Sequence, residues 1–185
     1  MMTGLKKIAL AFTVVALPYS ALAAPTVTFE GEVTDQTCSV NINGQTSSVV
    51  MLPTVAATEF GETLTNGQTA GLTPFTISLS GCKSSTSSTN ITTKFLGYDV
   101  DSTTGTLGNR ATTDAATGYG IQLTTSGTGG TAVQLSGVTS VPGLVLAANA
   151  TTASYEFGAQ YYVVDAATAA PGKISAVAEY TVSYL

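Results

Sequence analysis

The side chains that usually carry enzymatic chemistry are nearly absent from this sequence. Its 185 residues contain no histidine, so Ser-His-Asp and Cys-His sites cannot form, and zinc loses its commonest protein ligand. Carboxylates stand close together at Glu59 and Glu62 and at Asp99 and Asp101, without the pattern of a calcium loop or a distinctive catalytic spacing. The sequence therefore predicts no enzyme, no metal site and no cofactor.

The first 23 residues have the three parts of a secretory signal peptide. Lys6 and Lys7 precede an apolar run over residues 8–17, and small residues at 21 and 23 form a cleavage site. An N-terminal membrane anchor is the alternative, but the apolar run is shorter than the roughly 20 residues that a span needs. We expect cleavage after Ala23.

Cys38 and Cys82 are the remaining reactive groups. In an exported protein an oxidising compartment makes a disulfide between them the expected state, and two free thiols the less favoured one. Such a bond would stabilise the fold by roughly 4 kcal/mol in the chain-entropy model, because it closes a long loop.

The charge balance limits the kinds of partner. Removal of Lys6 and Lys7 with the leader would change the formal charge from −5 to −7. No basic patch remains, which argues against nucleic acid and anionic lipid as partners. The sequence contains no second long apolar segment, so direct membrane insertion is not expected.

Period-two alternation predicts an all-β chain. Near the expected start of the mature protein, Val27, Phe29, Gly31 and Val33 share one face of a strand. Further strand patterns, separated by turn signals, cover 38–42, 48–53, 73–82, 91–100, 118–125, 153–165 and 173–185. Repeated short strands with one apolar face indicate a single-domain β-sandwich. The first and last strand patterns lack the charges and prolines that normally protect sheet edges, which hints at pairing with another molecule.

These features together resemble the structural subunits of chaperone–usher pili, the type 1 fimbrial pilin family. The stretches that carry the resemblance are TVTFEGEVTDQTCSV, FTISLSGC and PGKISAVAEYTVSYL, with Gly172 placed 13 residues before the end and Tyr184 penultimate. The resemblance implies an incomplete immunoglobulin-like β-sandwich that is completed by a donor strand from a neighbouring subunit.

The resemblance also implies the division of the chain and its partners. Residues 1–23 would be the signal peptide, 24–37 the donor-strand extension, with Val27, Phe29, Gly31 and Val33 as donors, and 38–185 the pilin domain. The last strand would form the groove and bind a periplasmic chaperone through Gly172, Tyr180, Val182, Tyr184 and Leu185. An outer-membrane usher and identical or related pilin subunits are the other expected partners.

The function predicted on this basis is a structural subunit of a surface fimbria that polymerises by donor-strand exchange, supports adhesion, and reaches the surface through the periplasm. The alternative is a minor adaptor or an adhesive, carbohydrate-binding fimbrial subunit. A strand 24–37 that pairs within its own domain remains the alternative for the opening segment.

Overall fold

The computed structural model describes residues 31–36, 38–45 and 48–184. The predicted signal peptide lies outside the described residues, as do Val27, Phe29 and Leu185. Within the described ranges, no helix is long and apolar enough to cross a membrane.

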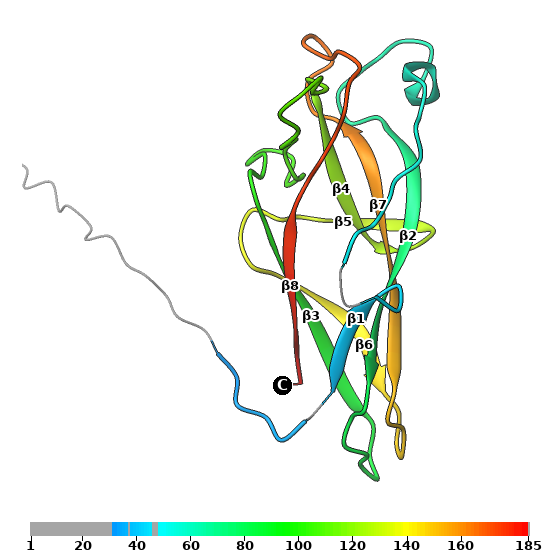
Figure 1. The fold of residues 1–185 in the computed structure, drawn as a ribbon, viewed down its shortest axis with the longest axis vertical. Helices are drawn as coiled ribbons and strands as arrows, with labels where there is room; N and C mark the ends of the chain where they lie inside the picture. The colour runs from blue at the N-terminus through cyan, green and yellow to red at the C-terminus, as the bar shows by residue number, and fades with distance from the viewer. Residues whose placement is uncertain (1–30, 37, 46–47, 185) are drawn as a thin grey trace, which may run out of the picture. The chain divides into compact units, whose positions relative to one another are not determined.

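The described part of the chain folds into two antiparallel sheets, which confirms the all-β prediction (Figure 1). The larger sheet has the strand order β1-β2-β7-β4-β5 and the smaller one β6-β3-β8. The strands are β1 Ser39–Ile42, β2 Thr69–Ser80, β3 Thr89–Gly97, β4 Tyr119–Ser126, β5 Gly129–Val133, β6 Thr139–Leu146, β7 Ala153–Val163 and β8 Ala178–Ser183. A short 3-10 helix, η1 Ala57–Phe60, lies between β1 and β2.

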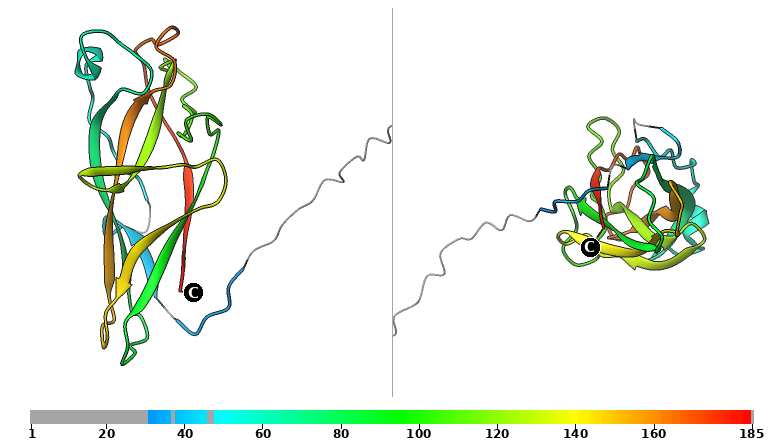
Figure 2. Two further views of the ribbon diagram at one scale, coloured as in Figure 1. Left: turned by 180° about the vertical axis from the view of Figure 1, so that it is seen from behind. Right: turned by 90° about the horizontal axis from the view of Figure 1, so that it is seen from below.

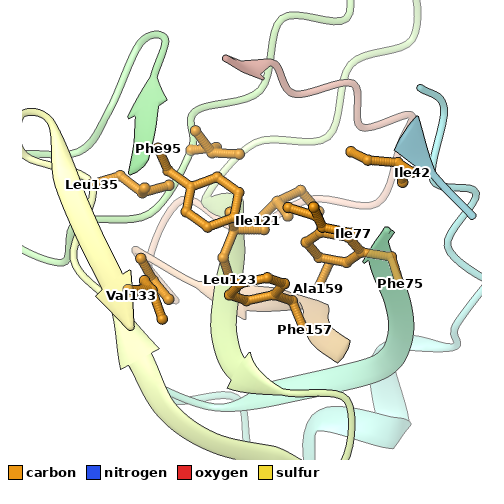
Figure 3. Close-up of a cluster of buried hydrophobic side chains, with 12 residues drawn as sticks. Ile42, Phe75, Ile77, Phe95, Ile121, Leu123, Val133, Leu135, Phe157 and Ala159 are labelled. Atoms are coloured by element: carbon orange, nitrogen blue, oxygen red, sulfur yellow. The ribbon is translucent and has the colours of Figure 1, made fainter. Parts of the chain in front are cut away.

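The core lies between the sheets and is built from the predicted alternation. In β2, Phe75, Ile77 and Leu79 are buried, while Thr76 and Ser78 between them are partly exposed. Phe157 of β7 pairs with Phe75 in the ladder, their ring centroids lie 5.6 Å apart, and the Phe95 ring of the smaller sheet meets Phe157 edge-on at 5.2 Å (Figure 3). These aromatic contacts join the two layers.

Two strands, β5 and β6, were missed by the sequence interpretation. The chain leaves the larger sheet after β5 and enters the smaller one as β6, as the view from behind shows (Figure 2). Pro142 and Gly143 interrupt the strand pattern of β6, and Pro142 cannot donate a ladder hydrogen bond. The position is tolerated because β6 is an edge strand and its register with β3 shifts there.

The predicted disulfide between Cys38 and Cys82 is present. Cys38 immediately precedes β1 and Cys82 follows β2, and the ladder pairs Ser39 with Ser80. The bond therefore fastens the open end of the β1–β2 pair at the edge of the larger sheet.

The segment 48–53 differs from its prediction. It has the alternating pattern of a strand, yet no strand is assigned to residues 48–56. Its side chains nevertheless alternate, with Val50 and Leu52 half-buried and Val49 and Met51 exposed. The segment has strand periodicity without a ladder partner among the described residues.

Thr93 gives a first testable prediction, because its fully buried hydroxyl oxygen has no hydrogen-bond partner within the described residues. Replacing it by valine should raise the free energy of unfolding by about 1–2 kcal/mol, since an unpaired polar atom is replaced by a methyl of similar size. Urea titration of the monomeric subunit measures this change.

Thr124→Val is the matched control for Thr93→Val. Thr124 is equally buried, but its hydroxyl donates to the Ser126 carbonyl at 2.8 Å. The control should therefore destabilise the domain, because it leaves that carbonyl without this donor. Equal destabilisation by both substitutions would contradict the interpretation.

Candidate functional site

An apolar groove of about 520 Å³ lies between the last strand and the segment that follows β1. Both chain segments can be followed in Figure 1, where β8 is red and the segment after β1 is cyan. The groove floor comes from both sheets and is mostly apolar: Ile42, Phe75, Phe95, Leu107, Ile121, Leu123, Ala159 and Tyr161. The groove therefore lies directly over side chains of the hydrophobic core, which are themselves buried.

One wall of the groove is formed by residues 174–178 and Tyr180. Every second side chain from Ile174 to Val182 points inward, but all of them are only half-buried. The row contains the small residues Ala176 and Ala178, which leave space above the floor. The apolar inward face of this wall is therefore only partly covered by the rest of the domain. An apolar strand face is usually buried.

The backbone of the same wall has an open edge. The carbonyl of Val177 accepts a hydrogen bond from the Tyr98 N–H at 3.0 Å, in line with the β3–β8 ladder. Since hydrogen-bonding groups alternate sides along a strand, Ala178, Tyr180 and Val182 direct theirs away from β3. Within the described residues β8 has no second neighbouring strand. This edge can accept a further strand.

The opposite wall is the segment 48–52. Val50 and Leu52 are its half-buried residues, and the far end is held where the Tyr161 hydroxyl donates to the Pro53 carbonyl at 3.0 Å. The two walls each carry a period-two row facing an apolar floor. Such a groove is suited to an extended segment whose alternate side chains are apolar.

The structure brings only some of the predicted site residues to the groove. Tyr180 lines it, whereas Val182 and Tyr184 pack against a second core cluster, formed by Leu79, Cys82, Ile91, Leu144 and Leu146. Gly172 lies elsewhere: a Cβ added to it would approach the backbone of residues 114–116 within 2.4–2.6 Å. Gly172 permits close packing of two backbone segments.

The described part of the predicted extension forms no strand in this isolated chain. Residues 31–36 lack ladder pairing, Gly31 is exposed, and Val33 is fully exposed. An apolar side chain that is entirely in water at this point has no stabilising contact in its own domain. The other predicted donor side chains, Val27 and Phe29, lie outside the described residues.

Sequence interpretation missed three parts of the site. The wall 48–52 was predicted as a strand but not as part of a groove, and Ala176 and Ala178 were noted only as members of the last strand. Glu32 lies between two positions of the apolar alternation of the opening segment, on the opposite face of the predicted strand. In the structure the Tyr184 N–H donates to Glu32 Oε1 at 2.9 Å, and the Ser183 hydroxyl donates to Glu32 Oε2 at 2.5 Å. No local sequence pattern indicates this contact, because its two partners are far apart in the sequence.

A pH titration should detect this contact. The Ser183 hydroxyl, then the Tyr184 N–H and, less strongly, the positive charge of Lys94 lower the pKa of Glu32 below its ordinary value of 4.5. Because the folded-state pKa is lowered, the contribution of Glu32 to stability is fully present above pH 4.5 and is lost as the pH falls through the lowered pKa. We expect the Tyr184 amide resonance to shift with a midpoint below pH 4.5.

The control for this titration is Glu32→Gln. It should remove the transition at Tyr184 while leaving the resonances of the distant core unchanged. A midpoint at or above 4.5 in the unmodified protein would contradict the hydrogen bonds as the cause.

Comparison with known proteins identifies the family and the fold of this chain. The sequence model of the family described as Fimbrial protein matches residues 27–185. The chain belongs to this family. It is a structural subunit of a fimbria, the surface fibre that such subunits build, and its relatives are structural proteins.

Two relatives show the extent of the likeness. The fimbrial protein is 35% identical to the major fimbrial subunit SMF-1 of Stenotrophomonas maltophilia (strain K279a), over 91% of this chain and 98% of the relative. It is also 35% identical to the F17 fimbrial protein of Escherichia coli, over 85% of this chain and 86% of the relative.

Solved structures show the same fold at low sequence identity. The P pilus rod subunit PapA superposes with a TM-score of 0.56 at 17% identity, over 80% of this chain and 99% of that one. The CupB6 tip adhesin of Pseudomonas aeruginosa superposes with a TM-score of 0.55 at 21% identity, and the match spans only 35% of the adhesin. The domain therefore has the immunoglobulin-like fold of chaperone–usher pilus subunits.

Proposed function

We propose that this fimbrial subunit polymerises by donor-strand exchange, in which residues 24–37 of one copy fill the groove of another. The observation that carries the proposal is the apolar groove beside the open edge of β8. Main-chain hydrogen bonds to Ala178, Tyr180 and Val182 would provide affinity, and alternate side chains of the donor would fill the groove above the core. This is β-augmentation, a known mode of recognition between an extended segment and a sheet edge.

The donor side chains match the groove in chemistry. Val27, Phe29 and Val33 are apolar and alternate with polar residues, as the groove requires. Each large apolar side chain that becomes fully buried contributes roughly 1.5–3 kcal/mol. Gly31 would lie where the groove is too shallow for a side chain, and Pro25 would limit pairing at the start of the donor strand.

Before assembly the groove needs a temporary occupant. We infer that, after removal of the signal peptide 1–23, a periplasmic chaperone supplies a strand to β8, and that the Leu185 carboxylate docks on basic residues of that chaperone. An outer-membrane usher would then exchange the chaperone for the next subunit. The single pilin domain and its surface rich in Thr and Ala favour the main shaft subunit over a minor one.

The test is the electrophoretic behaviour of the protein taken from the outer surface of its host. A denaturing gel without heating should show a ladder of multiples, and heating in acid should collapse it to one band. Non-covalent strand exchange predicts this, because no disulfide needs to join the copies. Deletion of residues 24–34 should leave only the single band.

The opposite results are equally clear. A single band near the mature mass under every condition would mean that the domain completes itself. A ladder that persists after the deletion of 24–34 would mean that another segment joins the copies.

A further inference from the structure

The outer face of the β3–β8 pair carries a carboxylate beside the open edge. Glu179 of β8 is exposed and pairs with Leu96 of β3 in the ladder. The Tyr98 hydroxyl donates a hydrogen bond to Glu179 Oε1, and this bond raises the pKa of the tyrosine. Glu179 forms no ion pair within the described residues, so no basic side chain in contact balances its charge. A strand added to this edge would therefore meet a negative charge on its outward face.

The outward face of the donor segment is itself charged at two of its three positions. When the apolar alternation of residues 27–33 faces the groove, Thr28, Glu30 and Glu32 face outward. A copy that donates its extension gives up the contact of Glu32 with its own β8, so both carboxylates reach the neighbour. Like charges that stand directly opposite each other on adjacent strands are destabilising. The placement of the donor decides which of the three residues meets Glu179.

The apolar alternation alone leaves more than one placement open, because a shift of two residues keeps the same face inward. The inward row of the groove wall runs over residues 174–180, and the donor alternation over 27–33 has the same length. Every pair of neighbouring strands in the described domain is antiparallel, so we place the donor antiparallel to β8. Full overlap then puts Val33 opposite Ile174, and we call this the overlapping placement.

The overlapping placement is the one that avoids a like-charge pair. It puts the uncharged Thr28 opposite Glu179. A shift of two residues toward the C-terminal end of β8, the shifted placement, puts Glu30 opposite Glu179 instead. In a donor that ran parallel to β8 and filled the same length, Glu32 would stand opposite Glu179. Repulsion at this one position therefore disfavours both the shifted register and the reversed direction.

Two further features agree with the overlapping placement. It sets Phe29, the largest side chain of the alternation, beside Ala178, which leaves space above the groove floor. A shift of two residues in the other direction puts Pro25 opposite Tyr180, whose backbone groups point away from β3. Pro25 has no N–H to donate in that pair.

We propose that Glu179 of the acceptor sets the register and direction of the donor strand supplied by the next copy of this chain. The inference rests on donor-strand exchange as proposed above. Glu179 is a positioning residue, because it acts by repelling Glu30 or Glu32 in the placements that bring either one opposite it. The hydrogen bond from Tyr98 holds its carboxylate on the outer face. Reversing the charge at position 179 should move the donor into the shifted placement.

The experiment reads the placement with pairs of engineered cysteines in fibres of full-length chains. Thr181 is an exposed residue on the outer side of β8. In the overlapping placement Thr26 stands opposite Thr181, and in the shifted placement Thr28 does. Opposite residues of this kind are close enough for a disulfide, whereas residues two positions along the strand are too far apart.

Two chains are compared, one with Thr26→Cys and Thr181→Cys, the other with Thr28→Cys and Thr181→Cys. Equal amounts of fibre are oxidised, heated in acid and separated without reductant. Covalent multiples then report a disulfide between neighbouring copies, since a bond within one chain gives a single band. An intact Cys38–Cys82 bond, mapped by mass spectrometry, shows that each chain has folded.

With Glu179 present, the covalent multiples of the 26–181 pair should exceed those of the 28–181 pair by at least about fivefold. In Glu179→Lys, attraction to Glu30 replaces repulsion, and the 28–181 pair should become the more abundant one. Glu179→Lys combined with Glu30→Lys is the matched control, because it restores a like-charge pair in the shifted placement. The 26–181 pair should dominate again in this variant.

The outcomes separate the two proposals. A 26–181 pair that still dominates in Glu179→Lys would overturn the role of Glu179 while leaving donor-strand exchange intact. If neither pair gave covalent multiples in any variant, the placement would be wrong, and the unheated gel would decide the rest. A ladder there that disappears on deletion of residues 24–34 would preserve donor-strand exchange without a role for Glu179. No ladder at all would overturn both.

Discussion

Replacing Ala178 with glutamate is expected to abolish fibre assembly while the domain itself still folds. Ala178 lies in β8, lines the groove and is half-buried, so its side chain faces the space that a donor strand would fill. Once a strand covers the groove, the new carboxylate would be enclosed among apolar groups without a partner. Burying an unpaired charge costs several kcal/mol, which exceeds the gain from one large apolar side chain of the donor. Polymers on an unheated denaturing gel should fall at least about a hundredfold.

Thr181→Glu is the matched control for Ala178→Glu. Thr181 belongs to the same strand but is exposed on the outer side of the sheet. This substitution adds the same charge three residues away and should leave assembly intact. Loss of polymers in both variants would point to a general effect of charge on β8, and unimpaired assembly of Ala178→Glu would exclude this line of the groove as the acceptor.

Removing the disulfide with the double substitution Cys38→Ala and Cys82→Ala should lower the free energy of unfolding by about 4 kcal/mol. The two cysteines are 44 residues apart in sequence, so the bond restricts a long loop of the unfolded chain. The loss is a large part of the roughly 5–15 kcal/mol that stabilises a typical domain. Urea unfolding of the monomeric subunit, followed by circular dichroism, measures the change.

Treatment of the unmodified subunit with a reductant provides the control for the double substitution. Reduction removes the same covalent constraint without removing the sulfur atoms, so both samples should unfold at similar urea concentrations. The loop closed by the bond includes β1 and the groove wall 48–52. If neither change moved the midpoint, the bond would contribute nothing to stability.

Alternation in the sequence predicted those strands that bury one face against the core. In β2 and β7 the apolar residues stand at every second position, and Phe75 and Phe157 are buried as expected. The disulfide followed from export and from having two cysteines. These features are local in the sequence or depend on composition, and both are visible without knowledge of the partner strands.

The groove could not be predicted in the same way, because it depends on which strands lie side by side. The segment 48–52 has strand periodicity, but whether it pairs is decided by a neighbour. Gly172 was assigned to the groove by its distance from the end of the chain, whereas the fold places it against residues 114–116. The contact of Glu32 with Tyr184 joins residues 152 positions apart, and no periodic pattern encodes it.

Ala176 and Ala178 set the depth of the groove, and this has a consequence for a cell that makes several kinds of fimbria at once. A donor with bulky side chains fits above alanine but would collide with valine or leucine at the same points. Larger residues in place of Ala176 and Ala178 in one kind of subunit would therefore exclude the bulky donor strand of the other kind. The purity of each fibre would be decided by side-chain volume, with no need for a separate sorting signal.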